Sequence, residues 1–401
     1  MSFDQQQGFS TKAIHVGSSP DPTTGATIPP VYLTSTYTQA APGQHKGYEY
    51  SRSNNPTRQG LEDCLAALEG GAEAACFASG LQATTTIVQS LLASGQSIVA
   101  YGDMYGGTYR LFERVFKPWG LTVHYTDENS PEAFAKLVDE TTRLVWLETP
   151  TNPMLRLLDI QAIGQAVKDR AARLGTSLSF AVDNTFASPV LQQPLSLGAD
   201  IVVHSTTKYI GGHSDLIGGA VICKTSQQME PIRFTQNAAG GVPGAFDCFL
   251  MHRGIKTLAL RMEAHSKNAQ CVAKWAAGQD KLERVIYPGL DSHPDYDLCT
   301  RQMASPGGMV SIVVPGGFDG ATSFMSSTQV FSCAESLGGV ESLCNHPAIM
   351  THASIPLERR EELGVVDGLV RLSVGVEDVD DLIADLDQAL AAVPSAKTAA
   401  R

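Results

Sequence analysis

The strongest constraint on the fold is a regular alternation of helical and strand-like segments between residues 60 and 250. Segments 60–69 (GLEDCLAALE) and 81–93 (LQATTTIVQSLLA) have helical spacing, and the first ends at the glycine pair Gly70-Gly71. Five short apolar runs are strand-like: AEAACFA, QSIVAYG, TRLVWLE, LSFAVD and DIVVHS. Helices that alternate with buried strands predict an α/β fold, in which helices cover both faces of a mostly parallel sheet.

Two further regions flank this alternating segment. Residues 1–60 contain many turn formers and few helix signals, which predicts an extended N-terminal arm, and the aromatic residues in VYLTSTY and YEY indicate that it packs on something. Residues 61–250 form the predicted large domain. After a helical stretch over 251–275, residues 251–401 predict a smaller α+β domain with strands MVSIVV and LVRLSV and a C-terminal helix, VDDLIADLDQALAAV. The tail PSAKTAAR is expected to fray.

Composition excludes several classes of function. The 401 residues are 43% hydrophobic and 17% charged, and the net charge of −12 argues against nucleic acid or an anionic membrane surface as partner. No apolar run approaches the ~18 residues of a membrane span, and the first residues lack the basic-then-apolar pattern of a secretory signal. Eight scattered cysteines without Cys/His ligand spacing predict small core side chains in a reducing cytoplasm, not disulfides or a metal site.

Three predicted strand ends carry polar residues. At Ser79-Gly80-Leu81 a strand joins a helix, and free backbone N–H groups at a helix N-terminus can bind an anion. Asp183 ends an apolar strand, where a buried carboxylate needs a cationic or hydrogen-bonding partner. Lys208 follows the hydroxyls of Ser205 and Thr207 in HSTTKYIGG, where another strand ends. Each has an ordinary structural interpretation as well: an N-capping serine, an aspartate that caps a loop, and a surface lysine.

Taken together, the three strand ends match the needs of pyridoxal 5′-phosphate (PLP). This cofactor needs a lysine for covalent attachment, an anion that keeps its ring nitrogen protonated, and donors for its phosphate. Tyr105 follows a further strand end and is either a cover for the cofactor ring or a core residue. A nicotinamide dehydrogenase or a nucleotide-binding enzyme is the alternative, but no GxGxxG follows the first strand and no GxxxxGK[ST] occurs.

Eight segments, in this order, resemble signatures of the cystathionine family of PLP enzymes: YSRSNNPTR, ASGLQA, YGGTYR, ETPTNP, VDNTFASP, HSTTKYIGGHSD, AESLGGVESL and RLSVGVED. The resemblance covers residues 11–391. It implies the fold-type I architecture, which is a mostly parallel seven-stranded sheet between helices with a smaller C-terminal α+β domain, and it implies PLP as cofactor. One departure is Gly211, where the family more often has asparagine; that position has no chemical role.

The resemblance also implies a role for individual residues. Lys208 is expected to hold PLP as a Schiff base and to move protons, Asp183 to pair with the ring nitrogen, and Tyr105 to stack on the ring and carry a proton. The expected phosphate ligands are Gly80, Leu81, Ser205 and Thr207, together with Tyr50 and Arg52 from a neighbouring subunit. The expected substrate contacts are Asn152, Arg371 and Ser336 at the α-carboxylate, with Glu49, Arg110 and Glu335 around the rest of the molecule.

Local residues point to one reaction within the family. Glu49, Gly107 and Glu335 resemble the transsulfuration members, particularly cystathionine γ-lyase, which converts L-cystathionine to cysteine, 2-oxobutyrate and ammonia. Cystathionine γ-synthase shares Glu335 and is the alternative, followed by O-acetylhomoserine sulfhydrylase and methionine γ-lyase. The resemblance further implies a small amino-acid substrate and a cytoplasmic homo-oligomer, expected to be a homotetramer built from two active dimers.

Overall fold

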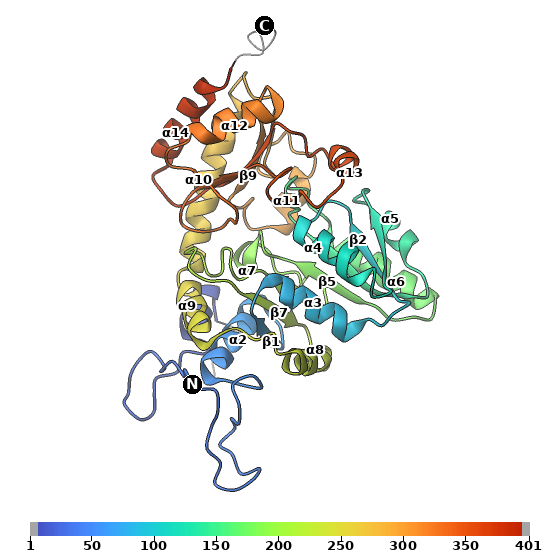
Figure 1. Cartoon of the computed structure of the whole chain (residues 1–401), viewed down its shortest axis with the longest axis vertical. Coiled ribbons are helices and arrows are strands. Elements are labelled where there is room, and N and C mark those ends of the chain that lie inside the picture. Colours follow the sequence, from blue (N-terminus) through green and yellow to red (C-terminus); the bar gives the residue numbers. More distant parts are fainter. Residues whose placement is uncertain (1–6, 395–401) are drawn as a thin grey trace.

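The computed structural model describes residues 7–394 and contains two β-sheets, their covering helices and a long N-terminal segment (Figure 1). The N-terminal segment lies at the bottom of the view and the C-terminal sheet at the top, with the larger sheet between them. Residues 395–401, most of the tail that was expected to fray, lie outside the described residues. Within residues 7–394, the longest and most apolar helices still fall short of what a membrane crossing requires.

The larger sheet has seven strands in the order β1-β7-β6-β5-β4-β2-β3. Their bounds are β1 Glu73–Phe77, β2 Ser97–Tyr101, β3 Thr122–Thr126, β4 Thr142–Glu148, β5 Ser179–Asp183, β6 Ile201–His204 and β7 Gly219–Cys223. All neighbours pair in parallel except β7, which runs antiparallel to both β1 and β6. The predicted α/β fold with a mostly parallel seven-stranded sheet is therefore confirmed.

Helices cover both faces of this sheet. They are α2 Pro56–Glu69, α3 Gly80–Leu91, α4 Gly106–Leu111, the π-helical turn η1 Phe112–Phe116, α5 Pro131–Leu137, α6 Ile160–Arg173, α7 Ser188–Leu191 and α8 Ser226–Ala239. Val145 and Leu147 of β4 belong to one apolar core with α2, α5 and α6, whereas Leu144 and Trp146 belong to a second core with α3, η1 and α8. Because both faces are buried, this strand is a continuous apolar run in the sequence.

The C-terminal region is built on a five-stranded sheet in the order β10-β11-β12-β9-β8, in which only β10 and β11 pair in parallel. Its strands are β8 Arg284–Ile286, β9 Met309–Val313, β10 Ser332–Cys333, β11 Leu343–Asn345 and β12 Leu369–Ser373. Its helices are α11 Tyr296–Gln302, α12 Gly317–Ser327, α13 Leu357–Glu362 and α14 Val379–Ala392. Apolar residues of α10, α12 and α14 pack with the sheet in a third core. The expected α+β architecture is confirmed.

Two helices occupy the predicted helical stretch over 251–275, namely α9 Ala245–Ile255 and α10 Leu258–Ala277. The break between them lies at Lys256 and Thr257. Arg261, in the first turn of α10, donates to the carbonyl of Gly254 at 2.9 Å and to that of Tyr209 at 2.6 Å. A buried guanidinium thus binds one carbonyl at the end of α9 and one in the loop after β6.

The N-terminal arm is largely without regular structure, as expected, and projects from the body of the molecule (Figure 1). Its one helix in the described residues is α1 Phe9–His15, which the sequence pattern did not predict. The backbones of Gly17 and Gly60 approach so closely that a Cβ on Gly17 would lie 1.8 Å from the Gly60 oxygen. This contact explains why glycine is required at both positions.

Side chains from α2 and α8 bind the free edge of β1, the first strand of the larger sheet. Glu62 accepts a hydrogen bond from the Cys76 N–H at 2.9 Å, and Gln236 donates to the Cys76 carbonyl at 2.6 Å. Arg233 donates to the Ala74 carbonyl and forms an ion pair with Glu62 at 2.8 Å. These contacts occupy backbone groups that would otherwise be open to pairing with another chain.

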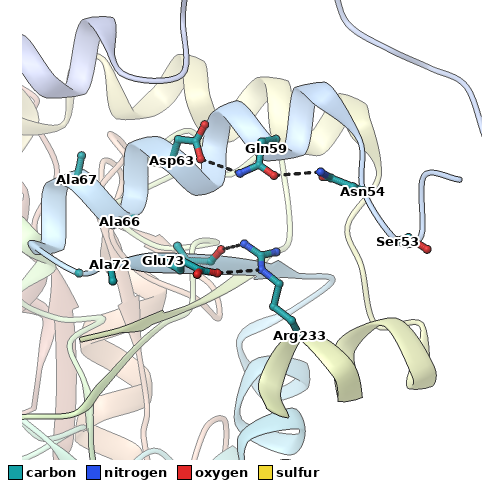
Figure 2. Close-up of a pocket in the computed structure, with 11 residues that line it drawn as sticks. Ser53, Asn54, Gln59, Asp63, Ala66, Ala67, Ala72, Glu73 and Arg233 are labelled. Atoms are coloured by element: carbon teal, nitrogen blue, oxygen red, sulfur yellow. Dashed lines mark hydrogen bonds and ion pairs between the residues drawn. The ribbon is translucent and has the colours of Figure 1, made fainter. Parts of the chain in front are cut away.

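A cleft of about 450 Å³ opens beside this edge, between α2 and β1. Figure 2 shows Arg233 pointing toward Glu73 on one side of the cleft and Gln59 between Asn54 and Asp63 on the other. Among the described residues that line it, none belongs to the predicted site. This cleft is therefore separate from the predicted site, whose residues lie at the strand ends.

The cysteines agree with the prediction of small core side chains. All eight are free thiols, and six of them are buried: Cys64, Cys76, Cys223, Cys248, Cys299 and Cys344. Cys271 is half-buried, and Cys333 on the edge strand β10 is exposed, so these two are not core residues.

Candidate active site

Lys208 lies in the turn that follows β6, at the carboxyl end of the parallel strands. Its Nζ donates a hydrogen bond to Ser336 Oγ at 2.8 Å, which joins the larger sheet to the loop after β10. Burial, helped by the positive charge of Arg371 and opposed by Glu335, lowers the pKa of Lys208 from 10.5 to about 8. A lysine in this environment can be neutral near physiological pH, as a nucleophile or general base must be.

Asp183 is the last residue of β5, one strand away from Lys208. Its Oδ1 accepts a hydrogen bond from the Thr185 N–H at 3.0 Å, and Thr185 Oγ1 accepts from the Ser205 N–H at 2.9 Å. Burial raises the pKa of Asp183, against the hydrogen bonds from Thr185. No ion pair reaches Asp183 from any described residue, so a cationic group such as a protonated ring nitrogen would meet an unmatched carboxylate here.

The N-terminus of α3 forms a cradle of backbone donors against Ser205. Ser79 caps the helix by accepting from the Gln82 N–H at 3.1 Å. A Cβ on Gly80 would lie 2.9 Å from Ser205 Cβ, and one on Gly219 would lie 2.2 Å from the Ser79 oxygen. Both glycines therefore allow three chain segments to meet where the first N–H groups of α3, including that of Leu81, are free for an anion.

Thr207 belongs to the same group of segments. Its Oγ1 donates to the Gly218 carbonyl at 3.2 Å and accepts from the Gly218 N–H at 3.1 Å. The loop after β6 is thereby pinned to the start of β7. The structure thus brings together Gly80, Leu81, Ser205 and Thr207, and a phosphate fits this donor set.

Tyr105 is the N-cap residue of α4, and its ring lies over Gly107. A Cβ on Gly107 would be 2.4 Å from Cε1 of the Tyr105 ring, so a glycine there makes room for the aromatic ring. The Tyr105 N–H donates to Glu148 Oε2 at 2.9 Å. Burial raises the pKa of the Tyr105 phenol; Arg110 lowers it, and Glu335 and Glu148 raise it further. Arg110 and Glu335, both exposed, are therefore the charged groups outside the buried core that act on this phenol.

Arg371 on β12 is 2% exposed and has only neutral partners among the described residues. It donates to Asn152 Oδ1 at 2.7 Å and to the Ser336 carbonyl at 3.1 Å, and its Nε is buried without a partner. Burial lowers the pKa of Arg371 to about 10. A buried guanidinium with an unused donor is the complement of a ligand carboxylate.

Ser336 has a strained backbone and contacts both Lys208 and Arg371. Its φ of 87° lies in the left-handed region, which is uncommon for a residue with a side chain. In this conformation its hydroxyl accepts from Lys208 while its carbonyl accepts from Arg371. Glu335 precedes it, and its negative charge raises the pKa of both Lys208 and Arg371.

The predicted residues of the arm lie elsewhere in the single chain. Glu49 forms an ion pair with His45 at 3.3 Å, the Arg52 guanidinium lies 5.4 Å from the centre of the Tyr50 ring, and Arg52 Nε donates to Asn237 at 3.4 Å. All three side chains are exposed. Within residues 7–394, no hydrogen bond or ion pair joins Glu49, Tyr50 or Arg52 to Lys208, so their expected role across a subunit interface stays a prediction.

Several residues that shape the site were not singled out from the sequence. Glu148, Thr185, Gly219 and His352 each contact a predicted residue or its segment. Glu148 and Thr185 stand within the quoted segments ETPTNP and VDNTFASP, and this was their only signal. His352, 1% exposed, makes a 2.9 Å hydrogen bond to the Asn152 carbonyl from a loop 200 residues away, and no local pattern indicates it.

Comparisons with known proteins agree with this arrangement. A family model described as Cys/Met metabolism PLP-dependent enzyme matches residues 10–391. Cystathionine gamma-lyase of Dictyostelium discoideum is 49% identical over 381 residues, which cover 95% of this chain and 97% of that protein. Cystathionine gamma-synthase of Mycobacterium tuberculosis (strain ATCC 25618 / H37Rv) is 50% identical over 384 residues, which cover 96% of this chain and 97% of that protein.

Solved structures show the same similarity in three dimensions. The crystal structure of metB from Corynebacterium glutamicum has a TM-score of 0.93 and 45% sequence identity, and the alignment covers 97% of this chain and 99% of that chain. That of cystathionine gamma-lyase from Lactobacillus plantarum complexed with L-serine has a TM-score of 0.92 and 43% identity, with 96% and 99% covered. The chain therefore belongs to the Cys/Met metabolism PLP-dependent enzymes, and it is a PLP-dependent transsulfuration enzyme, either a lyase or a synthase.

Proposed function

We propose that this enzyme cleaves the Cγ–S bond of L-cystathionine, consumes one molecule of water and releases L-cysteine, 2-oxobutyrate and ammonia. The observation that carries the proposal is the place of Glu335 directly before Ser336, which contacts both Lys208 and Arg371. In agreement with this place, the Glu335 charge raises the pKa of Tyr105, Lys208 and Arg371. The substrate carboxylate bound by Arg371 and the reacting carbons near Lys208 would leave the far end of a long substrate beside Glu335. A carboxylate there suits the distal ammonium of cystathionine.

Bound PLP supplies an electron sink that stabilises negative charge at the substrate carbons next to its amino group. Asp183 would keep the ring nitrogen protonated, because a negative charge opposite that nitrogen favours its protonated form. Gly80, Leu81, Ser205 and Thr207 would hold the phosphate, and Tyr50 and Arg52 would add to this set from a neighbouring subunit.

Lys208 removes the Cα proton of the substrate through Nζ and returns a proton later in the cycle. Burial lowers its pKa to about 8, so a substantial fraction of Lys208 is neutral in weakly basic solution. Ser336 Oγ, 2.8 Å from Nζ, orients the lysine. Tyr105 is the second candidate for proton transfer, since its phenol is subject to the charges of Glu335 and Arg371. The departing cysteine sulfur takes its proton from one of these two groups.

Arg371 and Asn152 hold the α-carboxylate of the substrate. The guanidinium is already fixed by Asn152 Oδ1 and the Ser336 carbonyl, so little side-chain entropy is lost when the substrate binds. Arg110 and Glu49 extend the contacts around the distal part of the substrate, Glu49 from the neighbouring subunit.

Cystathionine γ-synthase is the second candidate. It is favoured by the 50% identity to the mycobacterial gamma-synthase, which matches that to the Dictyostelium gamma-lyase. The synthase would bind the same cystathionine molecule as a product, so Glu335 would serve it equally well. The two proposals differ in their reactants: the lyase cleaves cystathionine and consumes water, whereas the synthase replaces the acyl group of an acylated homoserine by cysteine and releases the carboxylate.

The assembly proposed here is a cytoplasmic homotetramer of two active dimers. Its subunit is divided into an arm over 1–60, a cofactor domain over 61–250 and a C-terminal domain over 251–401. The exposed Tyr50 and Arg52 on the arm support this assembly, because both would need a neighbour to reach a phosphate. Light scattering of the purified enzyme tests the tetramer.

A product assay decides between the two reactions. The purified enzyme is given L-cystathionine in one reaction and O-succinylhomoserine or O-acetylhomoserine with cysteine in another, and 2-oxobutyrate and cystathionine are quantified. We expect faster cleavage of cystathionine than synthesis. A higher rate of cystathionine synthesis than of cystathionine cleavage would identify the enzyme as a synthase.

A further inference from the structure

Glu148 is a buried carboxylate at the end of β4 that has no part in the roles above. It is 5% exposed, and it pairs in register with Asp183 on the neighbouring parallel strand. Paired residues of adjacent strands point to the same side of a sheet, so the two carboxylates lie close together. Asp183 already has a proposed role opposite the ring nitrogen. The role of Glu148 is inferred from its contacts.

Glu148 holds the backbone of Tyr105. Its Oε2 accepts a hydrogen bond from the Tyr105 N–H at 2.9 Å, and the Tyr105 side chain itself makes no capping bond to α4. The Tyr105 ring packs over Gly107, which has no side chain that could hold the ring in place. The direction of the ring therefore depends on the backbone of Tyr105, and Glu148 is the side chain that fixes this backbone.

The surroundings of Glu148 disfavour a second negative charge. Burial and the charge of Asp183 raise the pKa of Glu148 well above its usual range, and Asp103 acts in the same direction; the Tyr105 N–H and Arg371 oppose them. Asp103 is itself buried, with its pKa raised to about 6. Two neighbouring carboxylates in such a place do not both ionise. Because Asp183 must be charged opposite the ring nitrogen, Glu148 is the one that keeps its proton.

We infer that Glu148 is a positioning residue: as a neutral acid, it fixes the Tyr105 backbone through Oε2 and leaves Asp183 as the single charge opposite the cofactor nitrogen. The inference rests on the proposed roles of Tyr105 and Asp183. It does not depend on whether the enzyme is a lyase or a synthase.

Two substitutions of similar size separate the hydrogen bond from the charge. Glu148→Gln keeps an oxygen acceptor and is always neutral, whereas Glu148→Met fills the space without an acceptor. Tyr105→Ala and the double variant Glu148→Met/Tyr105→Ala complete a cycle. Each protein is loaded with PLP and tested for kcat and KM on the better of its two substrates. The visible absorption band of the loaded enzyme is then titrated against pH without substrate, and thermal unfolding checks the fold.

We expect Glu148→Gln to stay within about threefold of the wild-type kcat/KM, with an unmoved midpoint of the spectral titration, because the charge near Asp183 is unchanged. Glu148→Met should lose about tenfold, since it leaves the Tyr105 N–H without an acceptor. The double variant should lose no more than Tyr105→Ala alone, because the two residues act as a unit.

Each of the following results would overturn the inference. A Gln variant with a shifted spectral midpoint, or one as impaired as the Met variant, would show that Glu148 acts as a charge. Additive losses in the double variant would show that Glu148 does not act through Tyr105. Loss in Tyr105→Ala without loss in Glu148→Met would refute the inference alone, whereas full activity in Tyr105→Ala would remove the proposed role of Tyr105 and the inference with it.

Discussion

Glu335 offers the most direct test of substrate recognition, through the replacement Glu335→Gln. The side chain is exposed, so its attraction for an ammonium about 4 Å away lies between about 1 kcal/mol in bulk water and about 4 kcal/mol near a protein surface. Solvent screening and side-chain ordering favour the lower end of this range. We therefore expect a loss of about 1–2 kcal/mol in transition-state binding of L-cystathionine, which is about a five- to thirtyfold fall in kcat/KM.

The substitution has a second effect that the assay must remove. Glu335 raises the pKa of Lys208, so its loss lowers that pKa and alters proton transfer for every substrate. A short γ-substituted amino acid without the distal ammonium, such as O-acetylhomoserine, experiences this effect but not the lost ion pair. The quantity to measure is therefore the ratio of the two kcat/KM losses. A ratio of one would refute the assignment of Glu335 to the distal ammonium.

Three further predictions concern the lysine and the arm. Lys208→Ala should abolish the visible cofactor band and turnover while far-UV circular dichroism and the oligomer stay unchanged, and retained wild-type activity would exclude Lys208 as the cofactor lysine. Arg52→Ala should weaken PLP retention in dialysis, and mixed oligomers with Lys208→Ala subunits should recover part of the activity; no recovery in verified hybrids would place Arg52 outside the partner site. Without cofactor, folded Lys208 has a pKa of about 8 against 10.5 in the unfolded chain, so it binds fewer protons when folded and stability rises with pH across that interval. Lys208→Met should thus be more stable than wild type by about 2 kcal/mol in urea unfolding at pH 7, with the difference shrinking toward pH 10; equal stability at pH 7 would contradict the burial argument.

The sequence predicted best those elements whose two faces are both buried. β4 and β5 are continuous apolar runs because helices cover both sides of the sheet, and their last residues mark the edge where chemistry is placed. β3 was not predicted, since its residues are mostly half-buried and form no apolar run. β7 was not predicted either, although it is fully buried. The loop 205–218 joins it to β6 without a helix, and the composition of a strand carries no sign of its antiparallel direction.

Contacts between distant segments account for the part of the site that could not be predicted. In the sequence, Glu148 is only the last residue of a strand. Its contact with the Tyr105 N–H, 43 positions away, is visible only in the folded chain. His352 likewise gains its meaning from Asn152. Burial lowers the pKa of His352 to about 4, so this imidazole is neutral and can fix the Asn152 backbone without adding a charge near Arg371. No local sequence pattern predicts either contact.

The two sheets of the molecule contribute opposite unmatched charges to one space. Asp183 on the larger sheet is a half-buried carboxylate without an ion-pair partner, and Arg371 on the smaller sheet is a buried guanidinium that donates only to neutral groups among the described residues. Each would be stabilised by a neighbour of opposite charge, yet the fold keeps them apart and joins the sheets through Lys208 and Ser336 instead. In the proposed assignment, the cofactor nitrogen and the substrate carboxylate would supply the charges that complete them. Binding of both ligands should therefore stabilise the contact between the sheets, with the substrate carboxylate toward Arg371 and its reacting carbons toward Lys208.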